Sequence, residues 1–159
     1  MCLNALNIKM RARKPIACYK ILKVLNGQIV SPFCNNYVWD ITGNINTASA
    51  VSPYVYDVYK RFLGIPFVKV VKGGYFHTFK KFSTAMKYME KELLMDKCIL
   101  CKCVIPKGST YYKGFFGNTG MSYACDSLIV DNPLFCSSCF LRDIMPFHDY
   151  VKACLITEY

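Results

Sequence analysis

Short runs of apolar, β-branched and aromatic residues, bounded by turn residues such as Gly, Pro and Asn, recur along this chain and are typical of β-strands. Asn26-Gly27 lies between two such segments and predicts a type I′ hairpin turn, because both central residues of that turn need positive φ. Residues 54–63 fit either a short helix or an extended segment. The predicted strands are 17–25, 28–30, 37–41, 65–71, 75–79, 98–105, 110–113 and 121–130.

A periodic pattern predicts a helix over residues 83–95. Ala85, Met86, Met89 and Leu93 recur at intervals of three and four, so they form an apolar stripe on one helical face. Ser83 is a suitable N-cap, because its hydroxyl can accept a hydrogen bond from an unpaired amide of the first turn. We expect this helix to pack against the sheet.

The composition favours a β-rich fold, since 53% of the 159 residues are hydrophobic and 15% are aromatic. We expect an α+β fold, with a small antiparallel sheet, one packed helix and a zinc-held β-hairpin element. The predicted parts are a flexible basic arm over residues 1–14, a basic α+β body over 15–96, and a four-cysteine zinc-ribbon-like part over 97–159. The last part is expected to pack on the body as one unit.

Two pairs of cysteines have the spacing of metal ligands. Cys98 and Cys101 form one C-x-x-C pair, Cys136 and Cys139 form another, and 34 residues lie between the pairs. Such a pair in a tight turn directs two thiolates at one ion, and four thiolates satisfy tetrahedral Zn²⁺. Val104–Gly114 lies between the pairs and reads as strand, turn, strand. We therefore expect a zinc site fastening a β-hairpin.

The ligand set has alternatives within the sequence. Cys103 shares a face with Cys101 on an extended chain, whereas Cys98 does not. Cys125 and His148 are further candidates, and three cysteines with His148 form the second choice of ligands. Because the sequence contains neither H-x-E nor H-E-x-x-H, we expect structural rather than catalytic zinc.

Disulfides and buried thiols are other uses for the ten cysteines. The first residues lack the charged-then-apolar order of a secretory signal, and no apolar run reaches the roughly 18–20 residues that span a bilayer. We therefore expect an intracellular, cytoplasmic protein with reduced cysteines, in the host cytoplasm if the protein is viral, and no membrane partner.

The net charge of +10 is unevenly distributed along the chain. Residues 1–80 contain 11 Lys and Arg against 2 Asp and Glu, whereas residues 81–159 contain 9 against 8. A basic half interleaved with aromatic residues suits nucleic acid, because cations meet phosphates and rings stack on bases; the same residues also suit a solvated surface and a core. The candidate nucleic-acid-binding residues are Arg11, Arg13, Lys14, Lys60, Arg61, Lys80 and Lys81.

His77 is the candidate catalytic residue of an alternative interpretation. It follows Gly73-Gly74 and lies between aromatic residues. A histidine in such a segment could act as a general base or bind a ligand. In that case it would act on a nucleotide-like molecule in a cleft lined by Tyr75, Ser31 and Trp39. A histidine with a ring nitrogen bonded to a backbone carbonyl explains the same pattern without catalysis.

Several short motifs resemble a set of small uncharacterised proteins of phages and gut bacteria, over roughly residues 17–130. The similar segments are 19–23, 31–33, 73–79 with the following helix, and 104–114. Such proteins carry no activity that could be transferred to this chain. Residues 98–139 also resemble zinc-ribbon and treble-clef modules, although the additional Cys103 departs from their pattern.

The expected function is therefore non-enzymatic. The sequence favours a zinc-stabilised accessory or regulatory module that binds a protein or nucleic acid, with an origin in a virus as one expectation. The oligomeric state does not follow from the sequence.

The four-cysteine interpretation makes a direct prediction about metal content. Purified protein should contain about one zinc per chain, because four thiolates saturate one tetrahedral ion. Cys136→Ser should remove that zinc and unfold the C-terminal part. Elemental analysis of the two proteins, together with thermal unfolding, checks this. A metal-free protein of unchanged stability would exclude the site.

Overall fold

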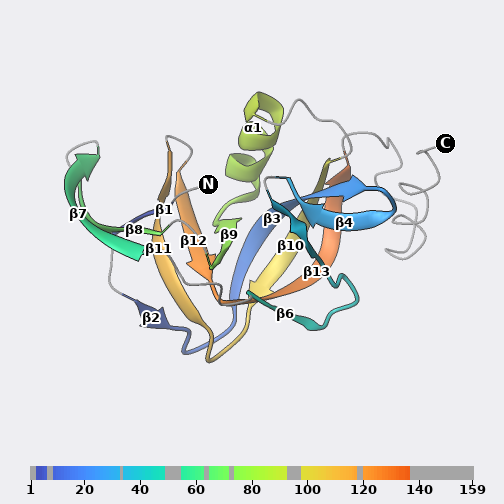
Figure 1. The fold of residues 1–159 in the computed structure, drawn as a ribbon, viewed down its shortest axis with the longest axis horizontal. Helices are drawn as coiled ribbons and strands as arrows, with labels where there is room; N and C mark the ends of the chain where they lie inside the picture. Colours follow the sequence, from blue (N-terminus) through green and yellow to red (C-terminus); the bar gives the residue numbers. More distant parts are fainter. Residues whose placement is uncertain are drawn as a thin grey trace.

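A computed structural model describes residues 3–6, 9–32, 34–48, 55–62, 65–71, 74–92, 98–117 and 120–136. In these residues one antiparallel sheet of 13 strands curves around a core, and one helix covers part of it (Figure 1). The elements are β1 (Leu3–Ala5), β2 (Met10–Arg11), β3 (Ile16–Leu25), β4 (Gln28–Ser31), β5 (Cys34–Val38), β6 (Ile45–Thr47), β7 (Val55–Phe62), β8 (Ile65–Val71), β9 (Phe76–Phe79), α1 (Phe82–Glu92), β10 (Cys98–Ile105), β11 (Thr110–Phe116), β12 (Met121–Cys125) and β13 (Ser127–Cys136).

The predicted α+β fold with a small sheet and a zinc-held hairpin is wrong, because the described chain is mostly sheet. The strand order is β6-β13-β10-β3-β9-β12-β11-β1-β8-β7, with β2 paired to β11 and β4 placed between β3 and β5. Residues 55–62, which fitted helix or strand, form β7. The segment 1–14 contributes β1 and β2, and Leu3 and Ala5 are fully buried between β8 and β11.

Three long stretches of chain form the centre of the sheet. Residues 98–116 run antiparallel to residues 121–136, because β10 pairs with β13 and β11 pairs with β12. Residues 10–25 pair with the other edge of the same stretch, with Lys23 opposite Cys98, Ile16 opposite Ile105 and Arg11 opposite Thr110. One constant register therefore runs from β10 and β3 into β11 and β2.

The turn Pro106-Lys107-Gly108 does not form the hairpin that the sequence suggested. β10 and β11, on either side of it, do not pair with each other but follow one another along the same strand partners. The turn is instead a corner at which the sheet bends. Ser109 N–H donates to the Pro106 carbonyl at 3.2 Å, and Gly108 has a φ of 90° that suits glycine.

The predicted turn at Asn26-Gly27 and the predicted helix are confirmed, because interactions between near neighbours in the sequence determine both. Asn26 and Gly27 have φ values of 48° and 72°, as a type I′ turn between β3 and β4 requires. α1 begins at Phe82, one residue before the predicted start, so Ser83 lies inside the helix and is not its N-cap as predicted. Ala85 and Met89 on its apolar face are fully buried against the sheet, whereas Lys87 faces solvent.

Buried side chains gather on both faces of the sheet. The largest cluster contains Leu22, Trp39, Ile99 and Leu128, and it fills the face away from the helix. The second cluster joins α1 to Ile21, Phe79 and Leu100. Since neighbouring residues of a strand point to opposite faces, β3 and β10 supply both clusters. Burial on both faces explains why these strands are almost continuously apolar.

No helix within the described residues is long and apolar enough to cross a membrane.

Gly114 provides a test of the pairing between β1 and β11. A Cβ atom at this position would overlap the Asn4 carbonyl oxygen and the Ala5 Cα, which are backbone atoms and cannot rotate away. Gly114→Ala should therefore lower the free energy of unfolding by about 1–3 kcal/mol or more. Chemical denaturation measures this change.

Gly27→Ala is the comparison variant. Nothing lies within 4 Å of a Cβ at Gly27, so only its φ of 72° opposes the substitution. Its expected cost is about 1 kcal/mol. A Gly114→Ala protein that is no less stable than Gly27→Ala would contradict the close approach of β1 to β11.

Candidate anion-binding pocket

The bend of the sheet arises where two prolines interrupt neighbouring strands. Pro15 lies between β2 and β3, and Pro106 lies between β10 and β11; neither has an N–H to donate to a ladder. The two corners are joined by backbone hydrogen bonds of 2.8 Å, from Ala12 N–H to Ser109 O and from Gly108 N–H to Ala12 O. The corners therefore stay in register although regular pairing stops there.

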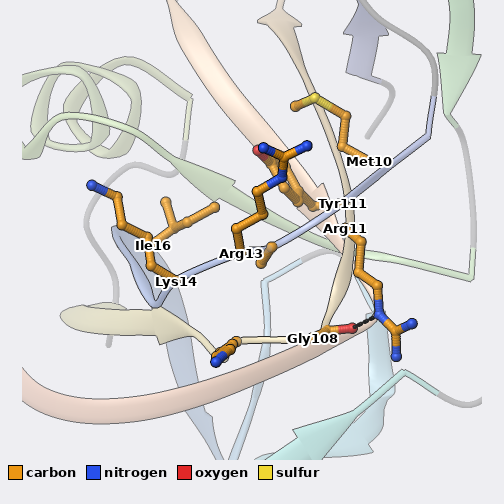
Figure 2. Close-up of a pocket in the computed structure, with 9 residues that line it drawn as sticks. Met10, Arg11, Arg13, Lys14, Ile16, Gly108 and Tyr111 are labelled. Carbon is orange, nitrogen blue, oxygen red and sulfur yellow. Dashed lines mark hydrogen bonds between the residues drawn. The ribbon is translucent and has the colours of Figure 1, made fainter.

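A surface pocket of about 870 Å³ lies against this double corner (Figure 2). Its volume is within the roughly 300–1,000 Å³ of typical ligand sites. Arg11, Arg13 and Lys14 line it from the segment around the first corner, and Lys107 lines it from the second. None of its lining residues in the described chain is acidic, so the pocket carries a concentrated positive charge.

The four cations have different local roles. Arg11 Nε donates to the Gly108 carbonyl at 3.1 Å and so ties the two corners together, as Figure 2 shows. Arg13, Lys14 and Lys107 are exposed, and within the described residues no hydrogen bond or ion pair holds their side chains. These three cations are therefore available to an anionic ligand.

The remaining wall of the pocket is apolar and aromatic. Ile16 and Tyr111 line it, and both are half-buried side chains that pack against the large core cluster. Tyr123 meets the Tyr111 ring edge-on, with centroids 6.0 Å apart and planes at 77°. The pocket thus combines exposed cations with an aromatic ring that packs against the core.

The structure brings together only part of the predicted basic set. Arg11, Arg13 and Lys14 share the pocket, whereas Lys80 and Lys81 are exposed residues just before α1 and do not line it. Lys60 and Arg61 belong to β7, at the far end of the strand order. Lys107 was not among the predicted residues, because only the pairing of the two corners places it beside Arg13.

The first cysteine pair does not form the metal-binding turn that its spacing suggested. Cys98 and Cys101 are both in β10, and residues three apart on a strand point to opposite faces. Cys98 is accordingly buried in the cluster under α1, and Cys101 in the large cluster on the other face. Cys136 ends β13 opposite Ile99, while Cys139 lies outside the described residues.

No group of three metal-ligating side chains is placed to hold an ion in the described part of the chain. The zinc-held hairpin of the predicted fold is wrong in its architecture, because β10 and β11 do not pair with each other and β10 pairs instead with β3 and β13. The four-cysteine zinc site as a whole stays a prediction. Its alternative ligand His148, like Cys139, lies outside the described residues.

The structure gathers a different set of cysteines around a buried lysine. The thiols of Cys18, Cys101, Cys103 and Cys125 belong to the large core cluster, and none of these four cysteines forms a disulfide with another described residue. Lys20 is 7% exposed; its Nζ donates to the His77 carbonyl at 2.9 Å and lies 4.8 Å from the Trp39 ring centroid. The sequence did indicate one part of this cluster, because Cys101 and Cys103 share a face on an extended chain.

Burial controls the protonation of this core cluster. It raises the pKa of Cys18 to about 12 and the pKa values of Cys103 and Cys125 well above the usual range. The same loss of solvent lowers the pKa of Lys20. The core therefore favours neutral thiols, which behave as small apolar side chains rather than as nucleophiles.

His77 occupies a different setting from the predicted cleft. Its ring contacts Phe116, with centroids 5.9 Å apart, and Nε2 lies 3.3 Å from the Val71 carbonyl oxygen. Phe76, the preceding residue, faces the opposite side and packs on Trp39, whose indole N–H donates to Ser31 Oγ at 3.0 Å. Trp39 and Ser31 therefore lie across β9 from the histidine ring.

The protonation of His77 follows from this setting. Burial, and secondly the positive charge of Lys20, lower the pKa of His77 to about 4. The imidazole is therefore neutral at physiological pH, and its Nε2 is within bonding distance of a backbone carbonyl, as the structural interpretation of the motif expects.

Comparison with known proteins found no matching family model, no matching curated protein and no matching solved structure. The resemblances noted from short motifs therefore stay predictions.

The lowered pKa of His77 predicts a stability that depends on pH. The unfolded chain binds a proton near pH 6.5 and the folded chain only near pH 4, so the stabilisation is complete above pH 6.5 and is lost as the pH falls toward 4. Between about pH 7 and pH 5 the wild type should lose about 2 kcal/mol from this group.

His77→Gln should remove most of that loss, because glutamine does not titrate and its amide can still donate to the Val71 carbonyl. Urea unfolding of both proteins at the two pH values measures the difference. An equal acid-induced loss in both proteins would contradict the lowered pKa of His77.

Proposed function

We propose that this chain is a non-enzymatic module that binds nucleic acid through the basic pocket at the double corner. The observation that carries the proposal is the convergence of Arg11, Arg13, Lys14 and Lys107 around one concavity without an acidic lining residue among the described positions. Clustered cations of this kind bind phosphates and release condensed counterions, which drives association with polyanions.

The charge distribution supports the same proposal. The chain has a net charge of +10, and the pocket gathers four cations around one concavity. Arg13, Lys14 and Lys107 belong to two corners whose backbones are joined by hydrogen bonds, so the fold keeps the three residues near one another. In this proposal the protein has a regulatory or accessory role because it binds nucleic acid, and it does not catalyse a reaction of the nucleic acid.

Binding should be measured by fluorescence anisotropy with labelled oligonucleotides over a range of salt concentrations. Arg13→Gln/Lys107→Gln should weaken binding by about tenfold or more near 0.1 M salt. Loss of two phosphate contacts should also reduce the slope of log K against log salt by about 1.4 for a single strand.

Lys87→Gln/Lys102→Gln is the matched control. It removes the same charge from two exposed lysines that do not line the pocket. Wild-type affinity is expected for this control. Equal weakening by both double variants would mean that general charge, and not the pocket, attracts nucleic acid. Binding that ignores salt would favour a protein partner instead.

A further inference from the structure

We infer that the pocket is specific for single-stranded nucleic acid, with one base stacked on the ring of Tyr111 and the adjoining phosphates bound by Arg13, Lys14 and Lys107. This inference rests on the proposed function and adds the form of the ligand. It depends on the apolar wall of the pocket, whereas the proposed function depends only on the clustered cations.

Tyr111 has the properties of a stacking platform. It is the aromatic residue among those that line the pocket in the described chain, and its side chain is half-buried. The edge-on contact with Tyr123, at 6.0 Å and 77°, supports the ring from the core. Because its orientation is set before binding, little conformational entropy is lost when a flat base stacks on it.

The cations are placed to hold a strand across that ring. Arg13 and Lys14 come from one corner and Lys107 from the other, and all three line the same pocket as Tyr111. Figure 2 shows Arg13, Lys14 and Tyr111 in this pocket. A nucleotide in a single strand presents a base between two phosphates. An aromatic wall with cations from two neighbouring segments matches that alternation of apolar and anionic groups.

The concave shape opposes a duplex. Paired bases are stacked inside the double helix, so a base can reach a recessed ring only after it is unpaired and unstacked, which costs a few kcal/mol. A single strand avoids this cost. The pocket should therefore bind duplex only through the weaker contacts of its exposed cations with phosphates.

The test compares Tyr111→Leu with Tyr111→Phe. Leucine keeps an apolar wall but removes the ring, whereas phenylalanine keeps the ring and removes only the hydroxyl. The probe is a labelled oligothymidylate of about ten nucleotides, within the span of known single-strand sites. Tyr111→Leu should weaken its binding by roughly 5- to 100-fold, and Tyr111→Phe should stay within about twofold of the wild type.

Three further probes define the ligand. An oligonucleotide of the same length with abasic sugars should bind wild type and Tyr111→Leu equally, since it has no base to stack. A duplex of the same length should bind both proteins equally and more weakly than the single strand. An oligouridylate shows whether RNA and DNA are both accepted. Thermal unfolding of each variant verifies that the fold is retained.

The possible failures are distinguishable. Equal binding of the oligothymidylate by wild type and Tyr111→Leu would overturn the stacking inference, and so would a loss that extends equally to the abasic strand. Tighter binding of duplex than of single strand would also overturn it. In each case the proposed function stands if Arg13→Gln/Lys107→Gln weakens binding and fails if that variant binds like wild type.

Discussion

The continuous pairing of β10 with β3 is the interaction on which the rest of this structure depends. Eight consecutive residue pairs, from Cys98 opposite Lys23 to Ile105 opposite Ile16, join segments that are far apart in the sequence. The pairing supplies both buried faces, with Ile99 and Leu22 on one side and Leu100 and Ile21 on the other. The remaining strands extend this ladder, and α1 covers one of its faces.

The same ladder explains why the candidate site lies where it does. A register that continues through the bend, from Ile16 opposite Ile105 to Arg11 opposite Thr110, forces the two proline-containing corners to coincide. Two backbone hydrogen bonds hold the corners together, while Arg13, Lys14 and Lys107 at these corners are exposed to solvent. A basic pocket beside an aromatic wall is the consequence of that constraint.

The core imposes a second constraint through its titratable groups. Lys20 is buried with four cysteines in the same cluster, and its amine is satisfied by the His77 carbonyl and by the face of Trp39. Because burial disfavours thiolates and raises the pKa values of Cys18, Cys103 and Cys125, these three cysteines serve as apolar packing groups. The C-x-x-C pattern of Cys98 and Cys101, which resembles a pair of metal ligands in the sequence, is thus part of a strand whose side chains alternate between two core clusters.

The sequence by itself determined the local structure: the Asn26-Gly27 turn, the helix that buries Ala85 and Met89, and most of the strands, because period and turn chemistry act between near neighbours. It also identified Arg11, Arg13 and Lys14 as a basic group. Only the tertiary structure decided that Leu3 and Ala5 are buried in a strand, that Cys98 and Cys101 face different clusters, and that Lys107 and Tyr111 join the basic residues. These features depend on which distant strands pair and in what register, and neither local propensity nor residue spacing contains that information.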